Sequence, residues 1–136
     1  MMFHRAPVWV VTAGLILAVV SGAALVAQSK RDVSVTAKRY TYVVADARGP
    51  EIRVRQNDLV SITLTAVDIP HSFTISDDHY RIDRRAEKGK PVTFRFRADK
   101  AGEFEIRCTL TIDERCPREM RGKLIVAPPA GDQPRR

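Results

Sequence analysis

The chain has 136 residues and a formal net charge of +7, from 23 Lys and Arg against 16 Asp and Glu. This length accommodates one domain of ordinary size. Nucleic acid is a poor partner for it, because basic and acidic residues alternate along the predicted strands and no aromatic-interleaved basic block occurs. The sequence also lacks a Ser/His/Asp or paired-carboxylate arrangement suited to hydrolysis, and we predict that the protein is not an enzyme.

An uncharged apolar segment, residues 8–27, precedes the polar part of the chain. As a helix rising 1.5 Å per residue, it is long enough to cross a hydrocarbon core of about 30 Å. A cleaved signal peptide is the alternative, since Ser21-Gly22-Ala23-Ala24 offers small residues, but the run exceeds the usual apolar region of such peptides. We predict an uncleaved single-pass anchor and tether over residues 1–31. Its N-terminal position favours export, which places the following domain on the periplasmic side of the cytoplasmic membrane.

The domain begins with two alternating segments. Residues 33–37 alternate apolar and polar side chains, which predicts a half-buried strand. The apolar parity then flips, so that Tyr40, Tyr42 and Val44 face inward. A one-residue slip of this kind is typical of a β-bulge, which we place near Lys38-Arg39.

The next predicted strands lie on either side of a proline. Residues 51–55 and 59–65 alternate around a tight turn and predict a β-hairpin. Pro70 ends this pairing, because proline cannot donate to a ladder. Residues 71–75 resume the alternation, whereas residues 76–89 are polar and rich in turn formers, and we predict a loop there.

Three further segments complete the strand pattern. Residues 92–97 and 103–108 alternate, and a final strand covers 120–126 before a proline-rich, charged tail over 128–136 that we expect to be disordered. Residues 32–127 therefore carry seven or so short strands, and no stretch of ten residues shows a helical stripe. This spacing predicts an all-β domain, an antiparallel sandwich or barrel.

Strand parity brings three metal-binding side chains to the inner side of the domain. His71 shares a face with Phe73 and Ile75, and Cys108 shares a face with the apolar residues of its own strand. Met120 likewise lies on the inward face of the last strand. An imidazole, a thiolate and a weak thioether are the ligand types of copper electron-transfer sites.

The segments DIPHSFTI, GEFEIRC and MRGKLIV together resemble the cupredoxin superfamily. The likeness is greatest to the copper domain of cytochrome c oxidase subunit II and to small membrane-anchored cupredoxin-like domains. It implies a cupredoxin-like antiparallel Greek-key β-sandwich over residues 32–127, preceded by the transmembrane helix. It also implies one copper ion and a role in electron transfer or copper handling, with a redox partner protein. The net positive charge of the domain separately suggests attraction to anionic lipid headgroups or an acidic surface.

The resemblance also implies the ligands, with one departure. The family's first histidine, its strand-end cysteine and its late methionine match His71, Cys108 and Met120. Cys116 stands where a second histidine is expected. The resulting set of His71, Cys108, Cys116 and Met120 is rich in sulfur and suits Cu(I), or Cu(II) held by thiolate. A binuclear centre is disfavoured by the same departure, as is a place in a respiratory oxidase.

A disulfide is the competing interpretation of the two cysteines. Cys108 and Cys116 are the only cysteines of the chain, on the predicted exported side, where disulfides persist. The connection between them contains Thr111-Ile112-Asp113-Glu114, which resembles a capping box and predicts one helical turn. Pro117 predicts that Cys116 is extended. In this alternative the chain is a metal-free accessory or binding domain stapled by a Cys108–Cys116 disulfide, with its basic surface as contact face.

Overall fold

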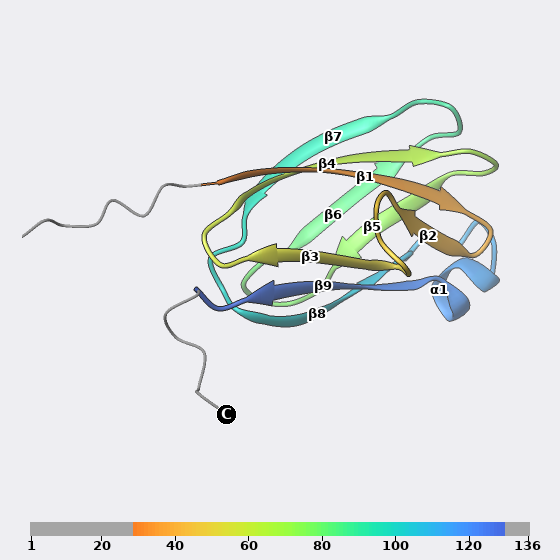
Figure 1. Cartoon of the computed structure of the whole chain (residues 1–136). Helices are drawn as coiled ribbons and strands as arrows, with labels where there is room; N and C mark the ends of the chain where they lie inside the picture. The colour runs from red at the N-terminus through yellow and green to blue at the C-terminus, as the bar shows by residue number, and fades with distance from the viewer. Residues whose placement is uncertain (1–28, 130–136) are drawn as a thin grey trace, which may run out of the picture.

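In the computed structural model of the chain, which describes residues 29–129, strands follow one another with a single short helix before the last (Figure 1). The elements are β1 Lys30–Lys38, β2 Thr41–Val44, β3 Glu51–Arg55, β4 Leu59–Ala66, β5 His71–Ile75, β6 Ile82–Ala86, β7 Val92–Arg97, β8 Gly102–Arg107, α1 Arg115–Glu119 and β9 Arg121–Ala127. The predicted all-β domain is confirmed.

Two sheets face each other to form a sandwich. The first has the strand order β2-β1-β4-β7 and the second the order β3-β9-β8-β5-β6. The pairing is mixed and not purely antiparallel as the sequence predicted, because β1 pairs with β4 and β3 with β9 in parallel. Two pairs of strands distant in the sequence therefore run side by side. Parallel pairing requires a long crossover connection, and alternation alone does not reveal which strands are joined in this way.

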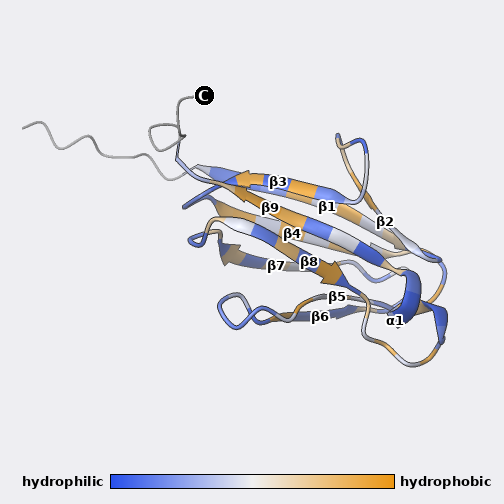
Figure 2. Ribbon diagram, turned by 90° about the horizontal axis from the view of Figure 1, so that it is seen from below, coloured by the Kyte–Doolittle hydropathy of each residue, from blue (hydrophilic) through white to orange (hydrophobic). Residues whose placement is uncertain are grey.

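The alternation predicted from the sequence places the core correctly. Figure 2 shows apolar and polar residues following each other along β3 and β9. Every second residue of β4 is buried. The core residues that are at most 1% exposed on the two inner faces include Val35, Ala37, Ile52, Val60, Ile62, Leu64, Phe73, Ile75 and Leu124.

The predicted hairpin of residues 51–55 and 59–65 is wrong. β3 and β4 belong to opposite sheets, so the turn at 56–58 carries the chain across the sandwich. The Asp58 carboxylate accepts the N–H of Arg55 at 2.9 Å, and the Asn57 N–H donates to the carbonyl of Ala98 at 2.7 Å. These bonds anchor the turn to both sheets, whereas the sequence showed only a short polar connection.

The predicted bulge near Lys38-Arg39 is also absent. β1 ends at Lys38 and β2 folds back on it, with Lys38 opposite Thr41. The parity flip therefore marks a tight turn between two strands. Tyr42 and Val44 are buried as predicted.

Strand β6 lies within residues 76–89, where we predicted a loop. Only its first and last residues, Ile82 and Ala86, are buried, and the three between them are exposed. β6 is an edge strand of its sheet. An edge strand with charged residues on both faces shows no alternation of apolar and polar residues, so sequence periodicity could not predict it.

The predicted anchor at 8–27 and most of the predicted tail, residues 130–136, lie outside the described residues. Among residues 29–129, no helix is long and apolar enough to cross a membrane.

Candidate metal centre

The four predicted ligand residues come from neighbouring segments at one end of the sandwich. His71 opens β5, Cys108 directly follows β8, Cys116 lies in α1, and Met120 is the C-cap of α1 just before β9. This end, marked by α1, is opposite the end at which β1 begins and β9 finishes (Figure 1). All four residues are buried, with at most 1% of their surface exposed.

The two cysteines form a disulfide, with their Cα atoms 5.5 Å apart. The staple that the sequence offered as an alternative is therefore present. Cys116 is helical and not extended as predicted from Pro117, because that proline sits in the first turn of α1, where a backbone N–H has no intrahelical acceptor. The helix also starts later than the predicted capping box, and its N-cap, Glu114, makes no side-chain capping bond.

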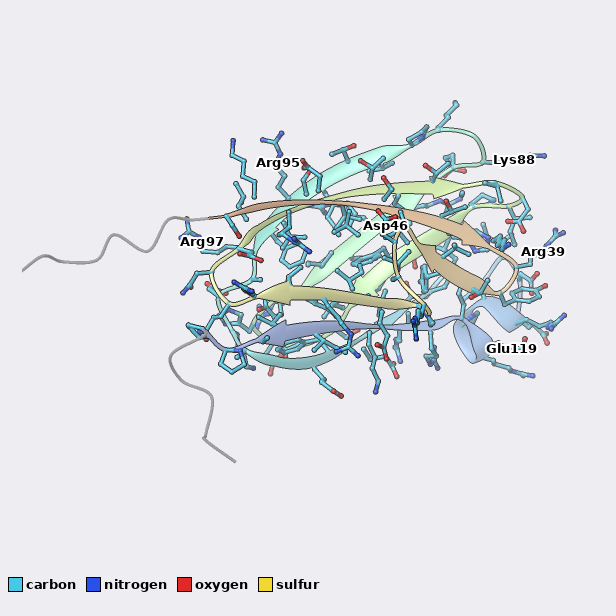
Figure 3. All side chains as sticks on the ribbon, viewed as in Figure 1. Arg39, Asp46, Lys88, Arg95, Arg97 and Glu119 are labelled. Carbon is cyan, nitrogen blue, oxygen red and sulfur yellow. A yellow bond between two sulfur atoms is a disulfide. The ribbon has the colours of Figure 1, made fainter. Side chains whose placement is uncertain are left out.

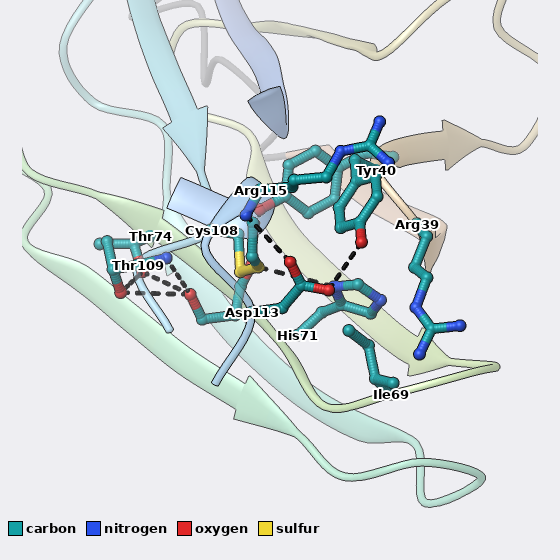
Figure 4. The surroundings of a disulfide bond; sticks show 12 residues. Arg39, Tyr40, Ile69, His71, Thr74, Cys108, Thr109, Asp113 and Arg115 are labelled. Carbon is teal, nitrogen blue, oxygen red and sulfur yellow. Dashed lines mark hydrogen bonds between the residues drawn. A yellow bond between two sulfur atoms is a disulfide. The ribbon is translucent and has the colours of Figure 1, made fainter. Parts of the chain in front are cut away.

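The His71 ring lies against the disulfide. Its Nδ1 is 3.8 Å from the Sγ of Cys116, and one ligand atom from each of His71, Cys108 and Cys116 lies within 4.8 Å of the others. Figure 4 shows the ring pointing toward the sulfurs. The structure thus brings together three of the four residues that the sequence nominated.

Asp68, which the sequence reasoning missed, orients the His71 ring. Its Oδ1 lies 2.7 Å from His71 Nε2 and accepts the N–H of Ile69 at 2.7 Å, while its Oδ2 accepts the N–H of Arg39 at 2.8 Å. Burial by itself raises the pKa of Asp68, but these hydrogen bonds outweigh it and lower the pKa to about 2. The carboxylate is therefore ionised at neutral pH. The three-residue spacing from Asp68 to His71 was the available sequence signal.

An ionised carboxylate only accepts hydrogen bonds, so the proton of the neutral His71 ring belongs on Nε2. The lone pair of the ring is then on Nδ1, the atom that faces Cys116. A carboxylate behind the remote nitrogen is the usual support of a metal-binding histidine, because it fixes both the tautomer and the orientation of the ring.

Hydroxyl groups hold the segment that follows Cys108. The N–H of Thr109 donates to Ser72 Oγ at 2.8 Å, and the hydroxyls of Ser72, Thr74 and Thr109 lie 3.2–3.3 Å from one another. Ser72 and Thr74 face away from the inner core, as predicted, yet both are buried. This small network ties the chain at Cys108 to β5, the strand that carries His71.

A second cluster, which we term the α1 clasp, consists of Tyr40, Asp113 and Arg115 (Figure 4). The Tyr40 hydroxyl donates to Asp113 Oδ2 at 2.6 Å, and the Arg115 guanidinium lies 4.2 Å from the centre of the Tyr40 ring. The backbone N–H of Arg115 donates to Asp113 Oδ1 at 2.9 Å. The bond from Tyr40 lowers the pKa of Asp113. The clasp connects the β1–β2 turn to the helix that holds Cys116.

The chemistry of the donor atoms fits copper only in the dithiol form. While the sulfurs are joined, neither Cys108 nor Cys116 is available as a thiolate. Two ligands at ~2.0–2.3 Å from a shared ion lie roughly 3.5 Å apart in a tetrahedral site, so the 3.8 Å between Nδ1 and the Cys116 sulfur is close to what is required. Soft sulfur and imidazole together select copper over hard cations.

Met120 and His79 are the two remaining candidates, within the described chain, for a ligand or a second imidazole. Met120 is fully buried, and its carbonyl accepts the N–H of Cys108 at 3.3 Å, but its role as a ligand stays a prediction. His79, the other histidine of the described residues, lies away from the centre and pairs with Asp99 at 2.5 Å. Within residues 29–129 no second imidazole therefore approaches the cysteines.

Similar solved structures share the fold of this chain. The periplasmic domain of subunit II of cytochrome oxidase (CoxB) of Bradyrhizobium japonicum has a TM-score of 0.63 and 17% identity, covering 77% of this chain and 89% of that one. A CoxB domain in a mixed disulfide intermediate with a thioredoxin-like TlpA has a TM-score of 0.59 and 18% identity, covering 76% and 86%. Auracyanin A, a "blue" copper protein of Chloroflexus aurantiacus, has a TM-score of 0.56 and 16% identity, covering 72% and 99%.

A heme-copper terminal oxidase dimer also matches, with a TM-score of 0.60, 22% identity and 73% of this chain covered, and here the chain spans 65% of the matched chain's length. No protein-family model matches the chain, and the comparison with curated proteins gives no match. The likeness to these structures shows a cupredoxin-like fold, as the sequence resemblance implied.

Proposed function

We propose that the chain is an exported, membrane-anchored cupredoxin-fold domain that binds one copper ion, once its disulfide is reduced, for electron transfer or copper handling. It turns over no substrate. The observation that carries this proposal is the His71 ring, held by Asp68 through Nε2 and directed at the cysteine pair through Nδ1. A carboxylate partner would satisfy a structural histidine as well, but the direction of Nδ1 toward two cysteines is what a soft-metal ligand requires.

In this proposal, some residues of the site bind the copper ion and others exclude water from it. His71 Nδ1 and the thiolates of Cys108 and Cys116 hold the ion, with the Met120 thioether as a weak fourth ligand. Copper bound there supplies a one-electron redox couple, and its affinity for sulfur matches the thiolate ligands. Phe73, which is fully buried two residues after His71 on the same face of β5, helps to exclude water.

Reduction of the disulfide is the step that makes the site available. It takes two electrons and two protons, which a protein dithiol supplies by thiol–disulfide exchange while it becomes a disulfide itself. The mixed disulfide between a CoxB domain and a thioredoxin-like protein supports a partner of that class. Cys108 and Cys116 are both buried, so α1 has to move before a partner thiolate reaches either sulfur.

The second candidate function is a metal-free accessory domain in which the Cys108–Cys116 disulfide is a permanent staple. The disulfide itself favours it. Mass spectrometry of protein trapped with a thiol-blocking reagent in its exported compartment separates the two. A blocked dithiol population supports the copper function, whereas a fully oxidised population under every growth condition supports the staple.

Copper titration of the full-length, reduced protein tests the main proposal. We expect one equivalent of Cu(I) to bind in competition with a chromophoric chelator, and Cu(II) to give thiolate-to-copper absorption. Cys108→Ser and His71→Gln should abolish tight binding. His79→Gln is the matched control, because His79 pairs with Asp99 away from the site. Undiminished binding in Cys108→Ser would overturn the proposal.

A further inference from the structure

A hollow of about 550 Å³ lies at the end of the sandwich opposite the candidate metal centre. It is framed by the start of β1, the end of β3 and the last residue of β9. We call it the basic hollow, and it is lined by Ser29, Lys30, Arg31, Arg53, Val54, Arg55, Asp58 and Ala127.

The basic hollow presents positive charge to the outside. Its four cationic residues, Lys30, Arg31, Arg53 and Arg55, are all exposed. Its one acidic residue, Asp58, is buried, and its carboxylate accepts hydrogen bonds from Ser29 Oγ and the Arg55 N–H.

Ion pairing cancels little of this charge. Arg53 pairs with Glu51 at 2.8 Å, and that pair is exposed on the outer face of β3. Within residues 29–129, no acidic side chain forms an ion pair with Lys30, Arg31 or Arg55. The surface of the hollow is therefore suited to an anionic partner.

The chain limits the distance between the hollow and the apolar segment 8–27. The Leu59 N–H donates to the carbonyl of Ser29 at 2.9 Å, so the domain holds the chain from residue 29 onward. Three residue steps separate Ala27 from Lys30, and an extended chain spans at most about 11 Å over them. This is close to the Debye length of ~8 Å at physiological ionic strength. If the apolar segment ends at the bilayer surface, the hollow lies within electrostatic reach of the headgroups.

We infer that the basic hollow docks on the anionic phospholipid headgroups of the membrane that holds the anchor. The inference rests on the membrane attachment within the proposed function and adds an orientation to it. With β1's start at the lipid surface, α1 and the His71–Cys116 centre point away from the bilayer. The disulfide and the copper site then face partners that approach from the aqueous side.

Arginine labelling of the full chain in lipid nanodiscs tests the inference. The discs contain phosphatidylcholine alone or with a one-third share of phosphatidylglycerol, and hydroxyphenylglyoxal reaction is followed by peptide mass spectrometry. We expect Arg31 and Arg55 to react roughly fivefold more slowly in the phosphatidylglycerol discs, since a cation at an anionic surface gains about that factor. Arg118, exposed on α1, is the internal reference and should not change. High salt should remove the difference.

Charge variants provide the matched comparison. In Arg31→Gln/Arg55→Gln, the protection of Arg53 by phosphatidylglycerol should be lost. The control Arg85→Gln/Arg107→Gln has the same net charge but removes cations outside the hollow, and it should keep the protection of Arg53, Arg31 and Arg55. An equal loss in both double variants would overturn the inference.

The remaining outcomes separate this inference from the proposed anchor. If the chain stays in the discs but its arginines react equally in both lipids, the anchor stands and the docking is wrong. If inorganic phosphate protects Arg31 and Arg55 in phosphatidylcholine discs as well as phosphatidylglycerol does, the hollow is a site for free anions and the docking is wrong. If the chain does not remain with the discs, the anchor and the docking both fail.

Discussion

His71 and Cys116 face each other inside the sandwich, with Nδ1 of the ring 3.8 Å from the sulfur, although 45 positions separate them in the sequence. The far nitrogen of the same ring is held by Asp68. The imidazole is thus already aimed at a sulfur that is bonded to Cys108. Reduction of that bond would free two thiols beside the ring, which is the ligand set of the proposed copper site.

Asp68→Asn should weaken copper binding by the reduced protein. An amide can turn its NH₂ group toward Nε2 and so place the ring proton on Nδ1, which removes the lone pair from the side that faces the cysteines. Changes to such supporting partners typically cost about 10- to 100-fold in metal affinity. Competition titration with a Cu(I) chelator measures this, with Asp78→Asn, an exposed residue in a distant turn, as the control. Equal affinity in the two variants would show that Asp68 does not support the site.

Reduction of the disulfide should lower the free energy of unfolding. The bond joins residues eight positions apart, and closing a loop of about nine residues is worth about 2.6 kcal/mol in the chain-entropy model. Urea denaturation of the full chain with and without a reductant gives the difference. A further addition of one equivalent of Cu(I) to the reduced protein should restore part of the stability, because the folded state gathers the ligands and so binds the ion more tightly than the unfolded state does. An unchanged midpoint on reduction would contradict the first expectation.

Tyr40→Phe should speed the reduction of the disulfide severalfold. The variant removes the hydrogen bond from Tyr40 to Asp113 that holds α1 to the β1–β2 turn, and the buried sulfurs become accessible only when α1 moves. The measurement is the rate of thiol release by a water-soluble phosphine. Tyr80→Phe is the matched control, because the Tyr80 hydroxyl donates to the Lys100 carbonyl at 2.6 Å but lies away from α1. The same rate in both variants would exclude a role of the α1 clasp.

Gly122→Ala should destabilise the domain by about 1–3 kcal/mol, the usual cost of overpacking. A Cβ at Gly122 would lie 2.8 Å from the carbonyl oxygen of Pro50, which accepts the N–H of Lys123 where β9 and β3 meet. Gly49→Ala is the control, since nothing lies within 4 Å of a Cβ there. Thermal unfolding of both variants checks the difference, and equal midpoints would contradict it.

Stability should fall in acid partly through Asp77. The backbone N–H of His79 donates to its carboxylate, and this bond is the main cause that lowers the pKa of Asp77 below its ordinary value of 3.8. A lowered folded-state pKa stabilises the protein above the ordinary value, and the contribution is lost as the pH falls through the lowered one. Asp77→Asn should therefore be less stable than the wild type at neutral pH, and the gap should close at strongly acidic pH. A gap that is constant with pH would contradict the assignment.

The sequence located most strands because alternation reports which face of a strand is buried. It missed β6, whose three central residues are all exposed. It also paired residues 51–55 with residues 59–65, although these strands lie in opposite sheets. Alternation carries no information about a strand's partner, and a short polar turn can either reverse a strand within one sheet or cross to the other.

Figure 3 shows the side chains at both ends of the sandwich, with Arg97 near the start of β1 and Arg39 and Glu119 at the opposite end near α1. The cations of the basic hollow come from β1 and β3, which lie in different sheets. Their convergence follows from the crossing of the chain between sheets. The same holds for the α1 clasp, whose Tyr40 and Asp113 are 73 positions apart.

By itself, the sequence determined that the chain forms an all-β domain and that His71, Cys108 and Met120 lie on its inner side, because a period of two fixes the face of each side chain. The cupredoxin-like type of that domain was implied by the resemblance of three segments to the family. Only the tertiary structure decided that Cys108 and Cys116 are bonded, that α1 brings Cys116 to the His71 ring, and that Asp68 turns the ring toward it. These relationships join segments distant in the sequence, and they depend on sheet order and loop path, which a local periodicity does not encode.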